Sequence, residues 1–293
     1  MSSRRRGRSA ATAVVVAVLL CLPACQDDPT ASRAPAAAEP TVTAEVVQLR
    51  RDQVLQRVEV AVHNAGSAEL FVKRLRLQVD GFDLPGALRK DEPLLAGQVV
   101  NLPVPFSGVS CPADGPPQIG PPRVTLDVRY GEDPRSRTVR LTADDRDGLL
   151  LRIATRACAV EHVLRDVDLR FSDHWRLERA PERDVLHGVL VARLRHGGRH
   201  TITQVDGAIM YGLRPDASVG AVPAPLAALT PERPEARIPV ISYAARCTAH
   251  TIGEIKKPYE FLVWVSTPGG GELAVTPTVG DGTKAALRQV CAF

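Results

Sequence analysis

Residues Val124–Tyr130 read VTLDVRY and alternate strictly between apolar and polar side chains. This period of two is typical of a strand with one face on a core and the other in water, because successive side chains point to opposite faces. The same alternation recurs at Arg57–Val62, Leu75–Asp80 and Val167–Phe171, whereas Phe261–Val265 is apolar throughout. Segments rich in Gly, Asn and Pro separate these strands. The chain is therefore predicted to be all-β.

An internal repeat extends this pattern to two copies. VLQRVEVAVHNAG (54–66) aligns with VLHGVLVARLRHG (185–197), and NLPVPFSGVSC (101–111) aligns with RIPVISYAARC (237–247). About seven short strands per copy predict two tandem β-sandwich domains that resemble immunoglobulin or fibronectin type III modules. The immunoglobulin pattern of cysteine, tryptophan and cysteine is absent from both copies.

The ends and the prolines of the two copies carry further expectations. Leu149–Cys158 and Thr283–Cys291 fit either a strand or a short helix, and helix propensity favours a helix for the second. Pro103 and Pro239 stand at equivalent places, which predicts edge strands or strand switches because proline cannot donate to a sheet ladder. Pro223–Pro239 is predicted to form a long loop.

Four cysteines follow the N-terminal leader: Cys111, Cys158, Cys247 and Cys291. An even number in an exported protein predicts two disulfides. The repeat aligns Cys111 with Cys247 and Cys158 with Cys291, so the expected pairing is Cys111–Cys158 and Cys247–Cys291, one bridge per domain. A metal site is the alternative, but it needs closely spaced Cys-x-x-Cys pairs, which the sequence lacks.

The N-terminus carries an export signal. Four arginines within the first eight residues precede a mainly apolar run, Ala10–Leu22, which is shorter than the roughly 20 residues that span a bilayer. The run ends in Leu22-Pro23-Ala24-Cys25, which resembles the lipobox of bacterial lipoproteins, although Pro23 is a less usual second residue. This resemblance covers only the leader. It implies that Cys25 becomes the N-terminus and carries a thioether-linked diacylglycerol.

The resemblance implies a lipid-anchored protein on the extracytoplasmic face of the cell membrane. The alternative is an ordinary secreted protein that is cleaved nearby and keeps Cys25 as a free thiol. Ser3–Arg6 hints at twin-arginine export, but the apolar residues that should follow are missing, so general secretion is favoured. The expected organisation is a signal peptide (1–24), an Ala/Pro-rich tether (25–40), and two β-sandwich domains (41–160 and 161–293).

Charge and composition exclude several classes of function. The chain has 293 residues with 37 basic and 33 acidic side chains, and four of the basic ones lie in the leader. The mature chain is therefore formally neutral, which argues against nucleic acid as a partner. Aromatic residues make up only 4% of the sequence, which disfavours an aromatic sugar-binding cleft. The excess of arginine over lysine is typical of a GC-rich genome such as that of an actinobacterium.

The sequence contains no zinc-protease motif, no Gly-x-Ser-x-Gly elbow and no phosphate loop. Asp145–Gly148 resembles part of a calcium loop, but Ala143 and Ala154 stand where an EF-hand needs ligands. His196 and His200 flank two glycines, which predicts a hairpin tip with both imidazoles in solvent rather than a metal site. We therefore predict no catalytic residue, no metal and no cofactor.

The two tryptophans are expected to be structural. Trp264 lies in an apolar strand and is predicted to be in the core, and Trp175 is predicted to pack at the junction of the two domains. The predicted function is that of a non-catalytic cell-envelope lipoprotein whose two modules contact another envelope protein. A protein that binds a small ligand or a glycan is the alternative, and an unrecognised secreted enzyme is the third hypothesis.

Overall fold

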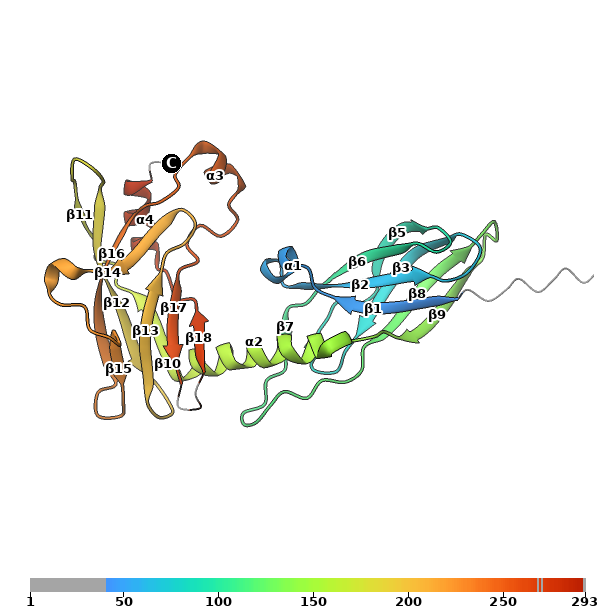
Figure 1. The fold of residues 1–293 in the computed structure, drawn as a ribbon, viewed down its shortest axis with the longest axis horizontal. Helices are drawn as coiled ribbons and strands as arrows, with labels where there is room; N and C mark the ends of the chain where they lie inside the picture. Colours follow the sequence, from blue (N-terminus) through green and yellow to red (C-terminus); the bar gives the residue numbers. More distant parts are fainter. Residues whose placement is uncertain (1–40, 268, 270, 292–293) are drawn as a thin grey trace, which may run out of the picture. The chain divides into compact units, whose positions relative to one another are not determined.

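The computed structural model describes residues 41–267, 269 and 271–291 (Figure 1). The expected signal peptide, Cys25 and the tether up to residue 40 lie outside these residues. The described chain is mostly β, with several antiparallel sheets, which confirms the predicted fold class in its coarse form. Within this part of the chain, no helix is both long and apolar enough to cross a membrane.

The first half (residues 41–148) contains a three-stranded sheet in the order β1-β2-β6 and a four-stranded sheet in the order β5-β3-β8-β9. Alternate residues of these strands, such as Val60 of β2 and Leu126 of β8, form one buried core. A short pair, β4-β7, stands beside them. The elements are β1 Val42–Val47, α1 Arg50–Val54, β2 Arg57–Asn64, β3 Leu70–Gln78, β4 Phe82–Asp83, β5 Leu88–Leu94, β6 Val99–Pro105, β7 Gly108–Val109, β8 Arg123–Tyr130, β9 Ser136–Thr142 and the 3₁₀ turn η1 Arg146–Gly148.

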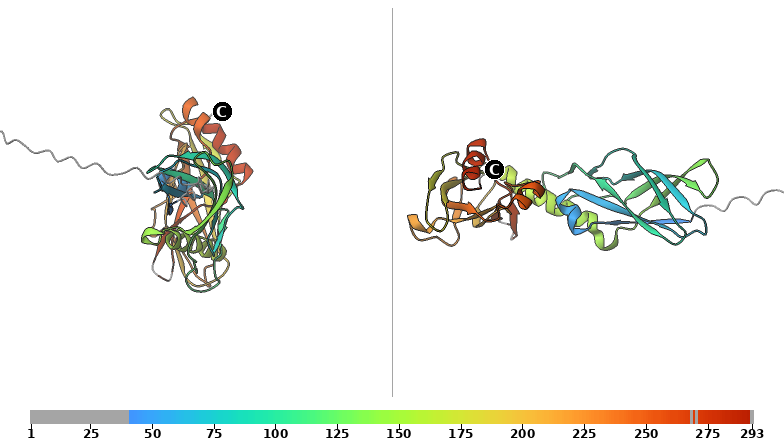
Figure 2. Two further views of the ribbon diagram at one scale, coloured as in Figure 1. Left: turned by 90° about the vertical axis from the view of Figure 1, so that its right-hand side faces the viewer. Right: turned by 90° about the horizontal axis from the view of Figure 1, so that it is seen from above.

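The second half (residues 167–291) contains two further sheets around a second core. One sheet has the order β10-β12-β16-β14, with β11 also paired to β12, and the other has the order β15-β13-β17-β18. Figure 2 gives two further views. The elements are β10 Val167–Phe171, β11 Arg176–Glu178, β12 Val185–Leu194, β13 His200–Asp206, β14 Tyr211–Pro215, η2 Ala217–Val219, β15 Ala227–Leu229, β16 Glu235–Ala244, α3 Ala249–Glu254, β17 Leu262–Ser266, β18 Glu272–Val275 and α4 Asp281–Val290.

Helix α2 (Leu149–Asp166) joins the two halves. Its Leu150 is buried in the first core and its Val163 in the second, and the predicted boundary between residues 160 and 161 falls inside it. Disulfides link Cys111 to Cys158 and Cys247 to Cys291, the pairing that the repeat predicts. The terminal segments of both copies, which were open between strand and helix, are helical in α2 and α4.

The repeat alignment is wrong by one residue in its first stretch. It places Val58 over Val189, but Val58 is buried in the first core, whereas Val189 is only half-buried and points away from the second core. The structural equivalents of the core valines of β2 are Gly188 and Leu190, because β16 pairs with these residues as β6 pairs with β2. A shift of one residue moves every side chain of a strand to the other face, so the alignment mistook the outward face of β12 for its core face.

The prolines follow the predictions only in part. Pro103 lies in β6, which is an edge strand of its sheet. Pro239 lies in β16 between β12 and β14, so the predicted edge position is wrong. Its ring is tolerated there because β14 has already ended, and its carbonyl accepts the backbone N–H of Asp216 at 3.0 Å. The predicted loop over Pro223–Pro239 instead contains β15 and the start of β16.

An ionic cluster closes the outer face of the β1-β2-β6 sheet. Asp52 of α1 and Glu59 of β2 are both buried, and Arg57 donates to Asp52 at 2.5 Å while Arg51 donates to Glu59 at 3.3 Å. Burial raises the pKa of Asp52, but hydrogen bonds from Arg57 and the backbone of Leu49 outweigh it and hold that pKa below its usual value. This face of the first half is therefore sealed by paired charges under α1.

Candidate binding groove

The outer face of the corresponding sheet in the second half carries apolar residues on β12 and β16, beside charged ones such as Arg170 and Arg237. On β12 and β16 the residues that alternate with the core include Val189, Val191 and Ile241, and the last two are only 5% and 8% exposed although they point away from the core. The outward face of an antiparallel strand is normally polar. The apolar lining therefore marks this face as a contact surface rather than a solvated one.

Two loops turn this face into a groove. One wall is the turn Ala180–Arg183 between β11 and β12, and the other is the segment Asp216–Val222 that follows β14 and contains η2. Three cavities of about 710, 370 and 590 Å³ lie between and beside these walls. The first two share Arg214 and Ile241, and the last two share His187 and Asp216, so we describe them together as the groove.

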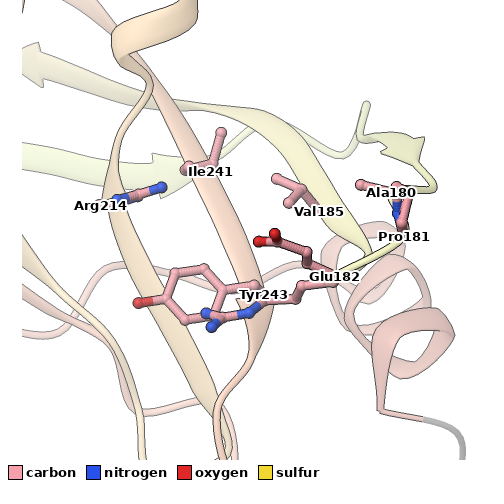
Figure 3. Close-up of a pocket in the computed structure, with 8 residues that line it drawn as sticks. Ala180, Pro181, Glu182, Val185, Arg214, Ile241 and Tyr243 are labelled. Atoms are coloured by element: carbon pink, nitrogen blue, oxygen red, sulfur yellow. The ribbon is translucent and has the colours of Figure 1, made fainter.

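Tyr243 forms the floor of the first cavity (Figure 3). The guanidinium carbon of Arg183 lies 4.4 Å from the centre of the Tyr243 ring, and that of Arg214 lies 6.0 Å away. Neither arginine forms an ion pair with any residue that the structure describes. Gly212 on the adjacent strand leaves room for the ring, since any side chain there would collide with it. Two unpaired cations beside an aromatic ring can accept an anionic or carbonyl group from a ligand.

At the middle of the groove, His187 contacts both β11 and the segment that follows β14. Its Nδ1 lies 2.7 Å from Oδ2 of Asp216, and its Nε2 lies 3.1 Å from Oε2 of Glu178 in β11. An ionised carboxylate only accepts hydrogen bonds, so the imidazole links Glu178 of β11 to Asp216 of the second wall when both ring nitrogens donate. Asp216 also accepts from the backbone N–H and the hydroxyl of Ser218.

The electrostatics of Asp216 follow from these bonds. Burial raises its pKa, but the hydrogen bonds from Ser218 and His187 together hold the pKa of Asp216 below its usual value. The Ser218 hydroxyl donates to Asp216 at 2.6 Å, rather than to the imidazole. These three residues therefore lack the contact through which a histidine activates a serine nucleophile.

Trp175 borders the third cavity and belongs wholly to the second half. Its ring covers Gly188, lies 5.8 Å from the ring of Phe171, and donates through Nε1 to the hydroxyl of Thr283 at 3.1 Å. The expected position at the junction of two domains is therefore wrong. The reason is local: Gly188 leaves a space on β12 that only a flat side chain from the neighbouring segment can fill.

Two other predicted side chains are placed differently from expectation. His200 is 3% exposed rather than solvated, because it begins β13 and faces Asp166 at the end of α2, with 3.8 Å between Nε2 and Oδ2. His196 is exposed as predicted. Trp264 is half-buried on the outward face of β17, where its Nε1 donates to Asp206 at 3.4 Å, so it does not belong to the core.

The aspartates near η1 serve a helix rather than a metal. Asp145 accepts the backbone N–H of Leu150 at 3.2 Å at the start of α2. Asp144 forms an ion pair with Arg146, whose guanidinium also approaches Glu45. Across the described ranges, no three His, Cys, Asp or Glu side chains are grouped as metal ligands would be.

One feature of the sequence indicates that β12 is apolar on both faces. Val185–Leu194 reads VLHGVLVARL and is nearly continuous in apolar residues, unlike the alternating RVEVAV of β2. A strand that is apolar at successive positions is covered on both faces. The polar residues of the groove come from loops and neighbouring strands, so their meeting in space has no counterpart in sequence spacing.

Comparison with known proteins does not place this chain in a family. No protein-family model matches it, and no curated protein matches it. The function therefore has to be inferred from the lining, size and charge of the groove.

Proposed function

We propose that this protein is a non-catalytic lipoprotein of the cell envelope whose second half binds an extended segment of a partner protein in the groove. The observation that carries the proposal is the apolar outer face of the β12-β16 sheet, which the two loops hollow into three joined cavities. Ile241, which lines the first two cavities, is only 8% exposed although it points away from the core.

The shape of the groove favours a polypeptide over a small ligand. Each cavity has a volume within the range of about 300–1,000 Å³ that accommodates one compact ligand. A compact ligand would fill one cavity and leave the others open, whereas an extended chain can place successive side chains in all three. Val219 and Val222 are 66% and 44% exposed at the rim, where a partner would cover them.

The proposed fold of each half is an immunoglobulin-like sandwich derived from an internal repeat. It is supported by the strand orders, because β1-β2-β6 corresponds to β10-β12-β16 and β5-β3-β8-β9 corresponds to β15-β13-β17-β18. A helix follows the last strand of each copy, and the second cysteine of the disulfide lies within α2 in one case and directly after α4 in the other. In such sandwiches, loops and outer faces commonly serve recognition.

Membrane anchoring through a lipid on Cys25 is part of the proposal and has its own test. Cells that express the full chain or a Cys25→Ser variant are fed radiolabelled palmitate, and the label on the protein and its partition into a detergent phase are measured. We expect both to be lost in the variant. A label that persists in Cys25→Ser would contradict lipidation at this residue.

Site-specific photocrosslinking in cells tests the groove. A benzoylphenylalanine residue replaces Val222 at the rim of the groove or Val99 in the first half, which is 54% exposed and serves as the control. We expect a discrete, stoichiometric protein adduct from position 222 and none from position 99. The adduct should disappear when Arg214→Glu and Tyr243→Ala are added.

Equal adducts from both positions, or an adduct that survives the two groove substitutions, would contradict the proposal. The small-ligand alternative would be favoured by two results together. Position 222 would give no protein adduct, and a small anion would raise the melting temperature of the protein. The melting temperature of each variant, measured without ligand, shows whether the groove substitutions leave the fold intact.

A further inference from the structure

The outer face of the β5-β3-β8-β9 sheet in the first half is strongly basic. Five side chains make up this basic face, and they come from three adjacent strands. Across β3, β8 and β9 the sequence supplies a single carboxylate, Asp127, which accepts from the hydroxyl of Thr138 at 2.9 Å. The basic face consists of Lys73, Arg74, Arg76, Arg129 and Arg140.

None of these five cations forms an ion pair with a residue that the structure describes. Lys73 donates to the hydroxyl of Ser136 at 2.8 Å, and Arg129 lies 5.1 Å from the centre of the Phe71 ring. At the margins of the sheet, Arg89 and Arg123 are paired with Asp91 and Asp80. Carboxylates thus pair with the arginines at the edges of this surface, whereas at its centre Asp127 is the one carboxylate among the five cations.

The register places like charges in the same rows. Arg76 and Arg140 both lie opposite Thr125, one on each side of β8, and Arg74 lies opposite Arg89 of β5. Like charges that face each other across strands destabilise a sheet. Asp127, which lies opposite Arg74 on β8, offsets part of this repulsion, and a negatively charged partner would relieve the rest.

We propose that the basic face docks the first half against a membrane surface that contains anionic phospholipids. The chain is formally neutral after the leader, so the positive charge is a local feature of this face. A row of unpaired arginines on an open sheet can contact several lipid phosphates at once.

The position of the tether selects the membrane as the partner. β1 begins at Val42, so about 17 residues separate the first half from Cys25, a reach of roughly 50 Å even when fully extended. The first half is therefore the part of the chain held nearest the bilayer. This step rests on the proposed lipid anchor, whereas the positive charge of the face does not.

Vesicle binding by a chain that begins at residue 26 tests the docking without the lipid anchor. The vesicles are phosphatidylcholine alone or phosphatidylcholine with about one third phosphatidylglycerol, and binding is measured by co-sedimentation at low salt and at about 0.5 M salt. We expect binding only to the vesicles that contain phosphatidylglycerol, and loss of that binding at high salt. Arg76→Glu with Arg140→Glu should weaken the affinity at least about tenfold.

The matched control reverses two exposed arginines elsewhere, Arg156→Glu with Arg199→Glu, which changes the net charge by the same amount. This control should bind as the unchanged chain does. Equal binding to both vesicle types, or equal loss in the two double variants, would overturn the proposal. So would binding to a soluble polyanion such as polyphosphate without any binding to vesicles. If the chain binds the anionic vesicles as expected but Cys25→Ser still carries the palmitate label, the proposal of a lipid on Cys25 is contradicted. The proposal that the basic face binds anionic membranes is then still supported.

Discussion

β2 in the first half and β12 in the second occupy equivalent places between two neighbouring strands, yet their outward faces differ in chemistry. The outward side of β2 carries Arg57 and Glu59, which α1 seals with Asp52. The outward side of β12 carries Val189 and Val191 together with His187, which pairs with Asp216 and Glu178. The inward residues of both strands are apolar and lie in a hydrophobic core. The outward residues are not constrained in this way, so they can form either buried ion pairs or a surface available for binding.

The largest expected effect tests what the two halves share. Replacing Cys111 and Cys158 by alanine, or Cys247 and Cys291 by alanine, should each lower the free energy of unfolding by about 4 kcal/mol, because the closed loops have similar lengths of 47 and 44 residues. Denaturant unfolding of the two double variants measures this. A loss in one half that is several times that in the other would break the equivalence of the two copies.

The next effect separates the two outward faces. Asp52→Ala should cost about 2 kcal/mol of unfolding free energy, because it removes the closer of the two buried carboxylates that pair with Arg57 and leaves only Glu59. Val189→Thr, at the corresponding face of β12, should cost less than about 1 kcal/mol, since this half-buried side chain faces the groove. Chemical denaturation compares them. Similar losses at the two positions would mean that the groove face is sealed as well.

Acid should act on the two halves over different ranges of pH. Burial lowers the pKa of His200 below 6.5, and nearby Asp166 opposes that shift only in part. The folded state therefore favours neutral His200, so its contribution to stability is complete above pH 6.5 and is lost as pH falls below that value. Asp52 has a lowered pKa, so its contribution is present above its unfolded value of 3.8 and is lost only at more acidic pH.

Melting curves of the unchanged chain and of His200→Gln measure this difference. Between about pH 6.5 and pH 5, the melting temperature of the unchanged chain should fall, and that of His200→Gln should stay more nearly constant. The Asp52→Asn variant serves as the control and should keep the decline over this range. A decline of equal size in His200→Gln would assign the acid sensitivity to another group.

The smallest expected effect concerns the basic face. Arg140→Thr should stabilise the first half by a few tenths of a kcal/mol, up to about 0.5, because it lowers the screened repulsion among the arginines of the basic face. Arg199→Thr, at an exposed turn of the second half, should leave stability unchanged. Urea titration resolves the two. Destabilisation by Arg140→Thr would show that this arginine has a favourable partner within the fold.

Sequence reasoning predicted the strands better than it predicted the surfaces. Strict alternation in Val124–Tyr130 identified β8, and the order of the cysteines indicated both disulfides. The alignment of the two copies assigned the wrong face of β12 to the core. The segment VLHGVLVARL has apolar residues on both faces of the strand, so its pattern fits equally well after a shift of one residue. Such a shift leaves hydrophobicity unchanged, and only the pairing with β16 determines which valines point outward.

The groove itself was beyond sequence reasoning for a physical reason. His187 meets Glu178 from the preceding strand and Asp216 from a loop 29 residues later, and these separations follow no motif. The buried state of His200 was missed because glycines on one side of a residue indicate a turn but do not indicate where the next strand begins. The predictions on residues 1–40 concern a part of the chain outside the described residues and stay predictions.

Each disulfide joins cysteines that follow one another along the chain: Cys111 bonds to Cys158, and Cys247 bonds to Cys291. In a chain that is exported N-terminus first and lipidated at Cys25, as proposed, Cys111 and Cys158 both emerge before Cys247. An oxidant that joins thiols in their order of appearance therefore makes the native bonds directly, and thiol exchange has no wrong bridge to correct. On the proposed export route, this connectivity would need an oxidase but no disulfide isomerase.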